Sequence, residues 1–270
     1  MKINFRFVEK LLTNFIKEEL TKFHFEKALL GLSGGLDSSV TAFLCARAMG
    51  SKNVLALIMP YGESFKKDVS HAENVVKILG INAKTINIKP MIDAYFSKYP
   101  TNNKILKGNK MARERMSILY DFSSREKAMV IGTSNKTELL LGYGTIHGDM
   151  ASGINPIGDL YKTQVRELGK HLGIPGEILN KTPSAGFWPG QTDEEEIGID
   201  YEKIDQILIQ MVDLRKQKKD LLSMGFSENI LNKIIEMIKN SEFKRKLPPI
   251  PKISERTVGH DFLFPYDWGK

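Results

Sequence analysis

The sequence predicts an α/β fold: an open, mostly parallel, doubly wound sheet with helices on both faces, followed by a C-terminal helical appendage. Two observations predict it. Short runs rich in Val, Ile and Leu alternate with amphipathic stretches as far as about residue 180, and such alternation is typical of parallel sheets covered by helices. Beyond that point two helical patterns follow without further strands. The 270 residues are enough to bury a substantial core.

The expected elements follow in order along the chain. An N-terminal helix over 8–23 has a broad apolar face, which would suit either a core or a subunit interface. Helical patterns next occur at 38–49 and at 63–79, where apolar residues share one stripe: Phe65, Val69, Ala72, Val76 and Leu79. The strand-like runs are 28–32, 54–59, 84–88 and 128–132.

We expect a single domain over 1–270. The appendage contains two helical patterns, 201–223 and 227–240, split by Gly225 and expected to pack on the core. The tail has too many prolines for regular structure. The expected parts are a core over 25–180, a loop and helical appendage over 181–250, and an irregular tail over 251–270.

Composition limits the function classes. The net charge is +7, with basic runs at 215–219 and 244–246; such runs are usually solvated, and attraction to polyphosphate or nucleic acid is the alternative. A single cysteine, Cys45, excludes an intramolecular disulfide and a cysteine-based zinc site, and we expect it to be a buried small hydrophobe. No segment resembles a signal peptide or a membrane span. We therefore expect a cytoplasmic protein without a membrane partner.

A Gly-rich loop over 33–39, in "LLGLSGGLDSSV", joins the first strand to the next helix. Ligands of open parallel sheets bind at the carboxyl ends of strands, and a helix N-terminus preceded by glycines suits an anion. The loop is neither GxxxxGK[ST] nor GxGxxG. Asp37 would repel a phosphate unless a divalent cation lay between them. The alternative is that Asp37, Ser38 and Ser39 only cap the helix.

The string SGGLDSS resembles the pyrophosphate-binding loop of the N-type ATP pyrophosphatases, which split ATP between its α and β phosphates. The family includes synthetases of NAD, GMP, asparagine and argininosuccinate as well as tRNA-modifying enzymes, and the loop does not choose among them. The resemblance implies an ATP site that contains Gly31, Leu32, Ser33, Gly34, Gly35, Leu36, Asp37, Ser38 and Ser39.

A second stretch, "VIGTSNKTELLLGYGTIHGDMASGINPIGDLYKTQV" at 130–165, strongly resembles the NAD synthetases, and the likeness runs from about residue 5 to 250. It implies that ATP activates deamido-NAD as an acyl-adenylate, which ammonia converts to NAD with release of AMP and pyrophosphate. It also implies Mg²⁺ as cofactor, ATP as co-substrate and a homodimer. The chain has neither the length nor a suitable cysteine for the glutaminase domain of glutamine-dependent relatives, so we expect free ammonia as the nitrogen donor; the alternative is ammonia delivered by a separate subunit.

The resemblance assigns roles to individual residues. Asp37 and Glu138 would bind Mg²⁺, and together with Lys162, which would hold the ATP phosphates, they form the expected catalytic set. Other assigned contacts are Thr133 and Ser184 to ATP and Arg113 and Lys244 to deamido-NAD.

Three of these segments have simpler interpretations. Asn135 and Glu138 have the spacing of a capping box, and so do Thr192 and Glu195 in an acidic segment that the family uses near its substrate. With Asp159 as N-cap, Lys162 would lie in the first turn of a helix, where the dipole disfavours a cation unless an anion binds nearby. The alternative for Lys162 is a solvated lysine.

The chain departs from the common family pattern at Ile146, Gly153 and Phe243, where many members have Lys, Asp and His. In the family these positions bear on deamido-NAD. The rival functions are a GMP synthetase-like enzyme, a tRNA-modifying enzyme and a non-enzymatic ATP-binding module. Thiolating tRNA enzymes use additional cysteines that this chain lacks, so the sequence does not favour nucleic acid as a partner.

Overall fold

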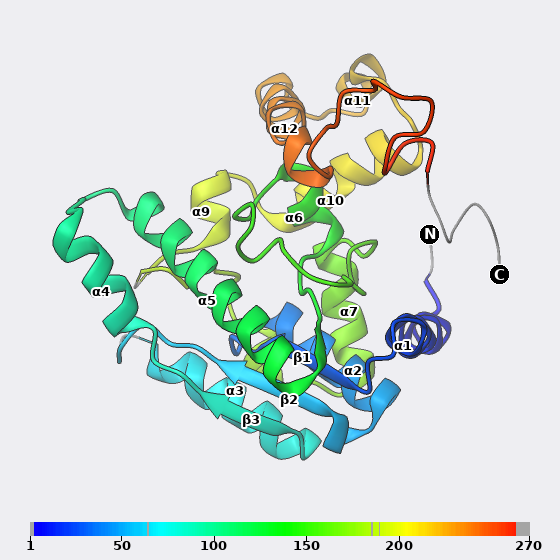
Figure 1. The fold of residues 1–270 in the computed structure, drawn as a ribbon. Coiled ribbons are helices and arrows are strands. Elements are labelled where there is room, and N and C mark those ends of the chain that lie inside the picture. Colours follow the sequence, from blue (N-terminus) through cyan, green and yellow to red (C-terminus); the bar gives the residue numbers. More distant parts are fainter. Residues whose placement is uncertain (1–2, 64, 185, 189, 263–270) are drawn as a thin grey trace.

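The computed structural model describes residues 3–63, 65–184, 186–188 and 190–262. Within this part of the chain, four parallel strands form one open sheet in the order β3-β2-β1-β4 (Figure 1). The predicted α/β class is therefore confirmed. The strands are β1 (Lys27–Gly31), β2 (Val54–Ile58), β3 (Asn82–Thr85) and β4 (Ala128–Val130).

Helices connect the strands and continue beyond the sheet. Short 3-10 turns lie at Ser51–Asn53 and Glu242–Arg245, and a π-helical turn at Ile209–Asp213 extends α10. The α-helices are α1 (Phe5–Lys22), α2 (Leu36–Met49), α3 (Lys66–Leu79), α4 (Lys89–Lys98), α5 (Lys104–Glu126), α6 (Lys136–Leu141), α7 (Lys162–Leu172), α8 (Gly176–Leu179), α9 (Asp193–Ile197), α10 (Tyr201–Leu208), α11 (Lys218–Ser223) and α12 (Glu228–Asn240).

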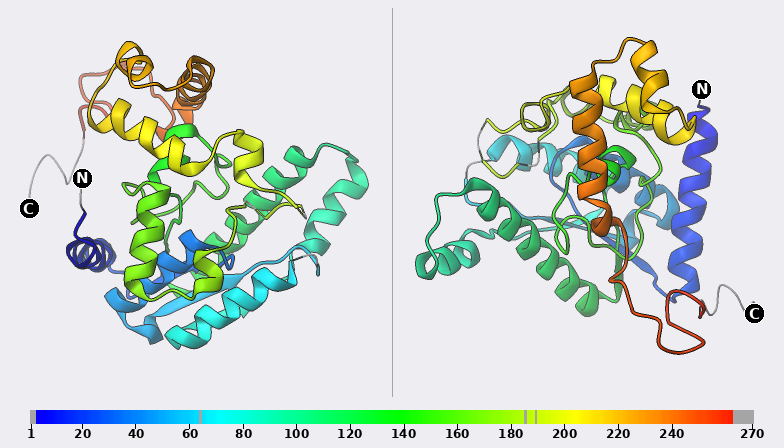
Figure 2. Two further views of the ribbon diagram at one scale, coloured as in Figure 1. Left: turned by 180° about the vertical axis from the view of Figure 1, so that it is seen from behind. Right: turned by 90° about the horizontal axis from the view of Figure 1, so that it is seen from above.

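Different helices cover the two faces of the sheet (Figures 1 and 2). Successive side chains of a strand point to opposite faces, so Leu30 of β1 packs with α1, α2, α3 and α7, whereas Leu29 packs with α4 and α5. Both clusters are buried and apolar. This is the doubly wound arrangement that the sequence predicts.

The sheet order creates a crevice at the carboxyl ends of β1 and β4. From β1 the chain crosses first to β2 on one side and returns later to β4 on the other side. Ligands of open α/β sheets bind where the strand order reverses in this way. The Gly-rich loop follows β1, and Thr133 lies shortly after β4, so both reach this crevice.

The helical appendage lies on α6 and α7, at one end of the molecule (Figure 2). Ile204 of α10 and Leu231 and Ile234 of α12 form a third buried cluster with Leu141 of α6 and with Tyr161. Its helices therefore pack on the core, as predicted.

Some predicted elements are corrected by the structure. The pattern over 201–223 is not one helix, because the chain leaves the helix after the π-helical turn and Arg215 adopts a left-handed φ of +53°. Like charges crowd the segment 215–219, which disfavours a continuous helix. The third strand begins and ends earlier than the predicted 84–88, and β4 is shorter than 128–132.

The ends of the chain and the lone cysteine give further comparisons with the sequence. Residues 251–262 have no regular helix or strand apart from a bridge between Val258 and Phe262; the rest of the predicted irregular tail, 263–270, lies outside the described residues. Cys45 is fully buried, as predicted. Among the described helices, none combines the length and apolarity needed to cross a membrane.

Candidate active site

A cavity of about 740 Å³ opens at the carboxyl ends of β1 and β4. Its volume lies in the range of sites for small molecules and cofactors. The wall is built from the loop after β1, from the segment after β4, from α5 and from the N-terminus of α7. The described part of the segment 181–196, which follows α8 and includes most of α9, contributes much of another side.

Hydrogen bonds within the Gly-rich loop fix its shape. The hydroxyls of Ser33 and Ser38 are hydrogen-bonded at 3.0 Å, and the Gly35 N–H donates to Ser33 Oγ at 3.2 Å. Ser39 is buried and donates its hydroxyl proton to the Gly35 carbonyl at 2.7 Å. Ser33 and Ser38 line the cavity, whereas Ser39 supports the loop from behind.

Gly34 is the point at which this loop requires glycine. Its φ is +75°, and a Cβ built on it would lie 2.0 Å from the carbonyl oxygen of Asp68 in α3. A side chain there would be strained by the backbone conformation and would also collide with α3. The close approach of loop and helix therefore depends on the missing Cβ.

Helix capping does not explain Asp37. The N-cap residue of α2 is Gly35, and the hydroxyls of Ser38 and Ser39 both return to its carbonyl. Asp37 instead accepts a hydrogen bond from Asn135 Nδ2 at 3.0 Å through Oδ1 and contacts Lys162 Nζ through Oδ2. Its carboxylate thus points away from its own helix, toward the elements that follow β4.

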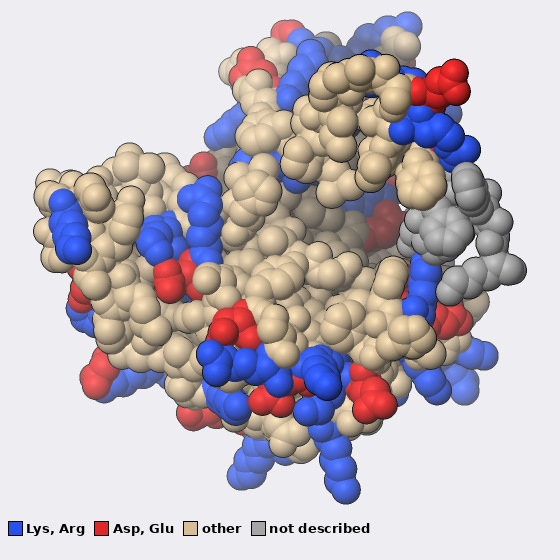
Figure 3. Space-filling view, in the orientation of Figure 1, with Lys and Arg blue, Asp and Glu red and all other residues tan. Residues whose placement is uncertain are grey.

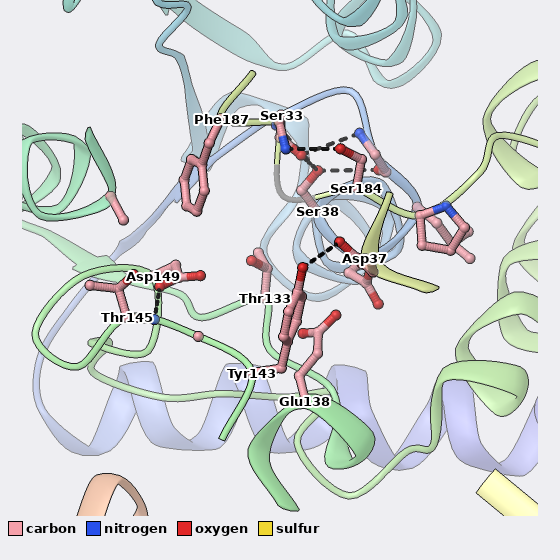
Figure 4. A pocket seen from close by; sticks show the side chains of 18 of the residues that line it. Ser33, Asp37, Ser38, Thr133, Glu138, Tyr143, Thr145, Asp149, Ser184 and Phe187 are labelled. Atoms are coloured by element: carbon pink, nitrogen blue, oxygen red, sulfur yellow. Dashed lines mark hydrogen bonds between the residues drawn. The ribbon is translucent and has the colours of Figure 1, made fainter. Parts of the chain in front are cut away.

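Lys162 lies between two carboxylates. Its Nζ contacts Asp37 and lies 3.3 Å from Glu138 Oε1, and Figure 4 shows the Asp37 and Glu138 side chains facing the same space beside Thr133. Lys162 is only 7% exposed, so the solvated-lysine alternative is wrong. Burial lowers the pKa of Lys162, but Asp37 and Glu138 more than offset this and hold it above its usual value.

Glu138 combines two contacts. Asn135 Oδ1 accepts from the Glu138 N–H at 2.9 Å, and the Asn135 N–H donates to Glu138 Oε2 at 3.3 Å, so the predicted capping box at α6 is confirmed. The other oxygen, Oε1, lies on the Lys162 side. Burial raises the pKa of Glu138 to about 8, Lys162 opposes the increase, and the neighbouring Asp37 adds to it.

Asp159 is not the N-cap of α7, contrary to the sequence prediction. Tyr161 occupies that position, and Asp159 lies in solvent with an ion pair to Lys136 at 3.0 Å. Lys162 is nevertheless in the first turn, as predicted. The prediction of the cap failed because the first N–H groups of α7 are bound by side chains from α6 and α10.

The structure brings together most of the predicted site residues. Exceptions are Gly34 and Ser39, which lie behind the loop surface, and Arg113, whose Nε donates to the Ile146 carbonyl at 3.2 Å outside the cavity wall. The predicted residues on the wall are Gly31, Leu32, Ser33, Gly35, Leu36, Asp37, Ser38, Thr133, Glu138, Lys162, Ser184 and Lys244.

The two basic runs behave differently. Residues 215–219 are mostly exposed, as expected of a solvated run. In the run 244–246, by contrast, Lys244 Nζ donates to the carbonyls of Gly142 and Gly144 at 2.8 and 2.9 Å. Burial lowers the pKa of Lys244, and Asp149 opposes this. Lys244 therefore supports the turn after α6 while it lines the cavity.

Arg115 is a cavity residue that the sequence did not single out. Its Nε donates to the Met59 carbonyl at 3.0 Å, and burial lowers its pKa to about 10. Arg113 and Arg115 are two positions apart on α5, and such residues face different sides of a helix. The motif MARERM contained both arginines but did not indicate which one faces the cavity.

Asp193, Tyr143 and Tyr201 form a second group that sequence reasoning missed. Asp193 accepts hydrogen bonds from Tyr143 at 3.0 Å and from Tyr201 at 3.1 Å, and burial raises its pKa. The available signal was the segment QTDEEE. Thr192 does cap α9, through a bond from the Glu195 N–H at 3.2 Å, and the same short helix places Asp193 on the cavity wall.

None of the three positions that depart from the family pattern lines the cavity. Gly153 donates its N–H to the Val130 carbonyl at 2.9 Å, and a Cβ there would lie 2.9 Å from the Met129 side chain. The Met129 side chain therefore leaves little room for an Asp at this position. Phe243 is 62% exposed, and the Ile146 carbonyl accepts from Arg113.

Comparisons with known proteins cover almost the whole chain. Residues 8–248 match a family model described as NAD synthase. A protein from Trichlorobacter lovleyi called NH(3)-dependent NAD(+) synthetase is 48% identical over 270 residues, which span 100% of this chain and 99% of the relative.

Solved structures are similar to this chain over most of its length as well. The structure of NMN synthetase from Francisella tularensis superimposes with a TM-score of 0.82 at 36% identity, covering 93% of this chain and 99% of that one. An NH3-dependent NAD synthetase from Campylobacter jejuni, solved with a nitrate ion, gives a TM-score of 0.79 at 33% identity, covering 93% and 100% of the two chains.

Proposed function

The chain belongs to the NAD synthase family, and we propose how its residues carry out the ATP-dependent amidation of deamido-NAD with ammonia. The nicotinate carboxylate attacks the α-phosphorus of ATP and releases pyrophosphate. Ammonia then attacks the acyl carbon of the resulting adenylate, which yields NAD and AMP. The observation that best supports this assignment is the meeting of the Gly-rich loop, Lys162 and Glu138 in one cavity.

The loop serves as the pyrophosphate site. Ser33, Gly35 and Ser38 line the cavity at the N-terminus of α2, where the helix dipole favours anions. Thr133 and Ser184 line the same cavity, and we propose them as further contacts to ATP. No side-chain nucleophile is required, because the reaction depends on alignment of the reactants and on neutralisation of phosphate charge.

Asp37 and Glu138 fit a magnesium site. Mg²⁺ in phosphate-transfer sites is held by one or two carboxylates together with substrate phosphates, and these two carboxylates lie on either side of Lys162. When bound there, Mg²⁺ would neutralise phosphate charge. Lys162, which is itself buried, contributes a fixed positive charge.

Small molecules are the substrates. On the face drawn in Figure 3, Lys and Arg side chains are scattered over the surface next to Asp and Glu side chains. This distribution is unlike the continuous basic stripe of a nucleic-acid site. Arg113 and Lys244 are the proposed contacts to deamido-NAD. Lys244 lines the cavity, and Arg113 lies outside its wall.

The enzyme acts as a cytoplasmic homodimer. Exposed apolar side chains on α1 (Phe7, Leu11 and Phe15) and on the arm formed by α4 and α5 (Tyr95 and Tyr99) supply surface suited to a subunit contact. A solution mass near twice the 30.5 kDa of one chain is expected by light scattering. A mass of one chain at micromolar concentration would exclude the dimer.

The assay that tests this function combines purified protein with ATP, Mg²⁺, ammonium and deamido-NAD and follows NAD and pyrophosphate together. We expect equal amounts of both products, and only when all four components are present. Glutamine in place of ammonium should yield no NAD. Tight binding of Mg-ATP without NAD formation from either nitrogen source would mean that the acceptor is a different molecule.

A mononucleotide acceptor is the second candidate. The reason is the likeness to a structure called an NMN synthetase, at a TM-score of 0.82, together with the departures at Ile146, Gly153 and Phe243. Nicotinate mononucleotide in a parallel assay separates the two. We expect a higher kcat/KM with deamido-NAD; a higher value with the mononucleotide would reassign the substrate.

A further inference from the structure

A buried carboxylate of the appendage reaches the elements that carry the site. Asp205, on α10, is only 1% exposed. Its neighbours Ile204 and Ile207 belong to an apolar cluster, so a charged side chain is unexpected there. Its Oδ1 accepts the hydroxyl proton of Thr137 in α6 at 2.6 Å, and its Oδ2 accepts the N–H of Thr163 in α7 at 2.8 Å. Burying a carboxylate is costly unless it is fully hydrogen-bonded, so packing alone does not explain it.

Thr137 extends this connection to Lys162. Its hydroxyl oxygen accepts the N–H of Lys162 at 3.0 Å while its proton goes to Asp205. The first two N–H groups of α7, at Lys162 and Thr163, are therefore bound by side chains from two other helices. The first N–H groups of a helix have no partner within it, and Tyr161, the N-cap residue, makes no side-chain cap bond.

The position of Lys162 makes this cap important. Lys162 is the first residue of α7, so loosening of the first turn would move its backbone and with it the amine that lies between Asp37 and Glu138. A carboxylate at a helix N-terminus also interacts favourably with the helix dipole. Asp205 thus stabilises the one turn from which Lys162 extends.

We propose that Asp205 is a positioning residue: through Thr137 and the Thr163 N–H it fixes the start of α7 and so directs Lys162 at the phosphate site. The helical appendage is then part of the catalytic apparatus rather than a separate covering of the core. This inference rests on the proposed function for the role of Lys162. Asp205 itself is not among the residues that line the cavity.

The test compares Asp205→Asn with Asp200→Asn. Both changes remove a carboxylate from the same helix region, but Asp200 is exposed and only caps α10, through a bond from the Lys203 N–H at 2.8 Å, a role that Asn fills equally well. An Asn at 205 can accept through only one oxygen. We expect D205N to lower kcat about 10- to 100-fold, because small misplacements of a catalytic group have effects of this size.

Measuring kcat and KM separately distinguishes a misplaced Lys162 from a general loss of structure. With D205N, the KM for deamido-NAD should stay within about threefold, because Lys244 and Arg113 lie on other elements, while Mg-ATP binding measured by calorimetry should weaken by about tenfold. D200N should match the wild type in both. Thermal melts confirm that rates refer to folded protein. Because calorimetry needs no acceptor, the inference is tested even if the acceptor is reassigned.

Thr137 supplies an independent pair of variants, which decides the matter if D205N does not fold. T137V removes the hydroxyl at nearly constant volume, and T137S retains it. We expect T137V to reproduce the loss of kcat and T137S to retain wild-type turnover. Folded D205N with the kcat and Mg-ATP affinity of D200N, or T137V and T137S with equal kcat, would overturn the inference. Wild-type protein that makes no NAD would instead refute the proposed function.

Discussion

Asp37 illustrates how much a single side chain depends on distant parts of the chain. It is the second residue of α2, yet both carboxylate oxygens are bound by residues that follow β4, Asn135 and Lys162. A local capping role would have left it on its own helix. The carboxylate is therefore placed by the tertiary fold, at the edge of the sheet where we propose that the phosphates bind.

Replacing Asp37 with Asn should depress turnover far more than stability. The amide keeps the shape and the bond to Asn135 but loses the negative charge proposed to hold Mg²⁺, so we expect kcat to fall by about 100-fold or more. Turnover at saturating Mg²⁺ is the measurement, with Asp159→Asn, in solvent before the N-cap of α7, as control. A near-normal rate for D37N at saturating Mg²⁺ would rule out the metal role.

Cys45 gives a residue-level prediction for pH. Burial raises its pKa from 9.0 to about 12, so between these values the unfolded thiol ionises while the native thiol keeps its proton. The native state then binds more protons, and stability must fall as pH rises through this window, by at most about 1.4 kcal/mol per pH unit from this group.

Urea midpoints at pH 8 and pH 10 measure this loss. The decrease between them should be smaller in Cys45→Ala than in the wild type, even though C45A is less stable at both pH values because of the cavity it leaves. The native thiol should also resist alkylation at pH 8. Rapid alkylation without unfolding would show that Cys45 is accessible.

Among the elements, the Gly-rich loop and α3 approach each other so closely that no side chain fits between them. Gly34 has a left-handed φ of +75°, and its missing Cβ would lie 2.0 Å from the Asp68 carbonyl. We expect Gly34→Ala to displace the loop, to lower the melting temperature and to weaken Mg-ATP binding at least tenfold. Calorimetry and thermal melts measure both effects.

Gly50→Ala is the matched control for this change. Gly50 also has a positive φ, +79°, but a Cβ there would meet no atom within 4 Å. Its substitution therefore adds backbone strain of about 1–3 kcal/mol without a collision. If G34A and G50A lowered stability equally and neither changed Mg-ATP binding, the contact between loop and helix would not matter.

The elements also show which features sequence patterns can predict. Apolar periodicity placed all four strands and α2, α3 and α12 within a few residues, because all of them except the exposed β3 bury side chains in one of the apolar clusters. The break after α10 was missed, since Arg215 in a left-handed conformation carries no apolar signal. The expected cap at Asp159 was wrong because α7 is capped by residues from other helices.

In the candidate site, too, some residues were predicted from the sequence and others were missed. A local motif indicated the loop, and likeness to a family indicated Glu138 and Lys162. Asp193, Arg115 and Asp205 were missed, because their importance arises only when α9, α5 and α10 meet the sheet edge. Nothing in the spacing of QTDEEE or MARERM specifies which side chain faces the cavity.

Considered as a whole, the molecule places its site where three parts meet: the sheet edge, the segment 181–196 and the helical appendage. The sheet provides the reversal of strand order, and the segment 181–196 contributes to the cavity wall. The appendage binds the start of α7 through Asp205. Such an arrangement couples the stability of the appendage to catalysis, because the site is complete only when all three parts are folded together.

The most direct test of this mechanism is the fate of the carboxylate oxygen. Deamido-NAD labelled with ¹⁸O in its nicotinate carboxylate is turned over with ATP, Mg²⁺ and ammonium, and the products are examined by mass spectrometry. Attack of the carboxylate on the α-phosphorus predicts one ¹⁸O atom in AMP and none in pyrophosphate. Label in orthophosphate, with ADP as the second product, would show that the γ-phosphate is attacked and would contradict a pyrophosphate-binding role for the loop.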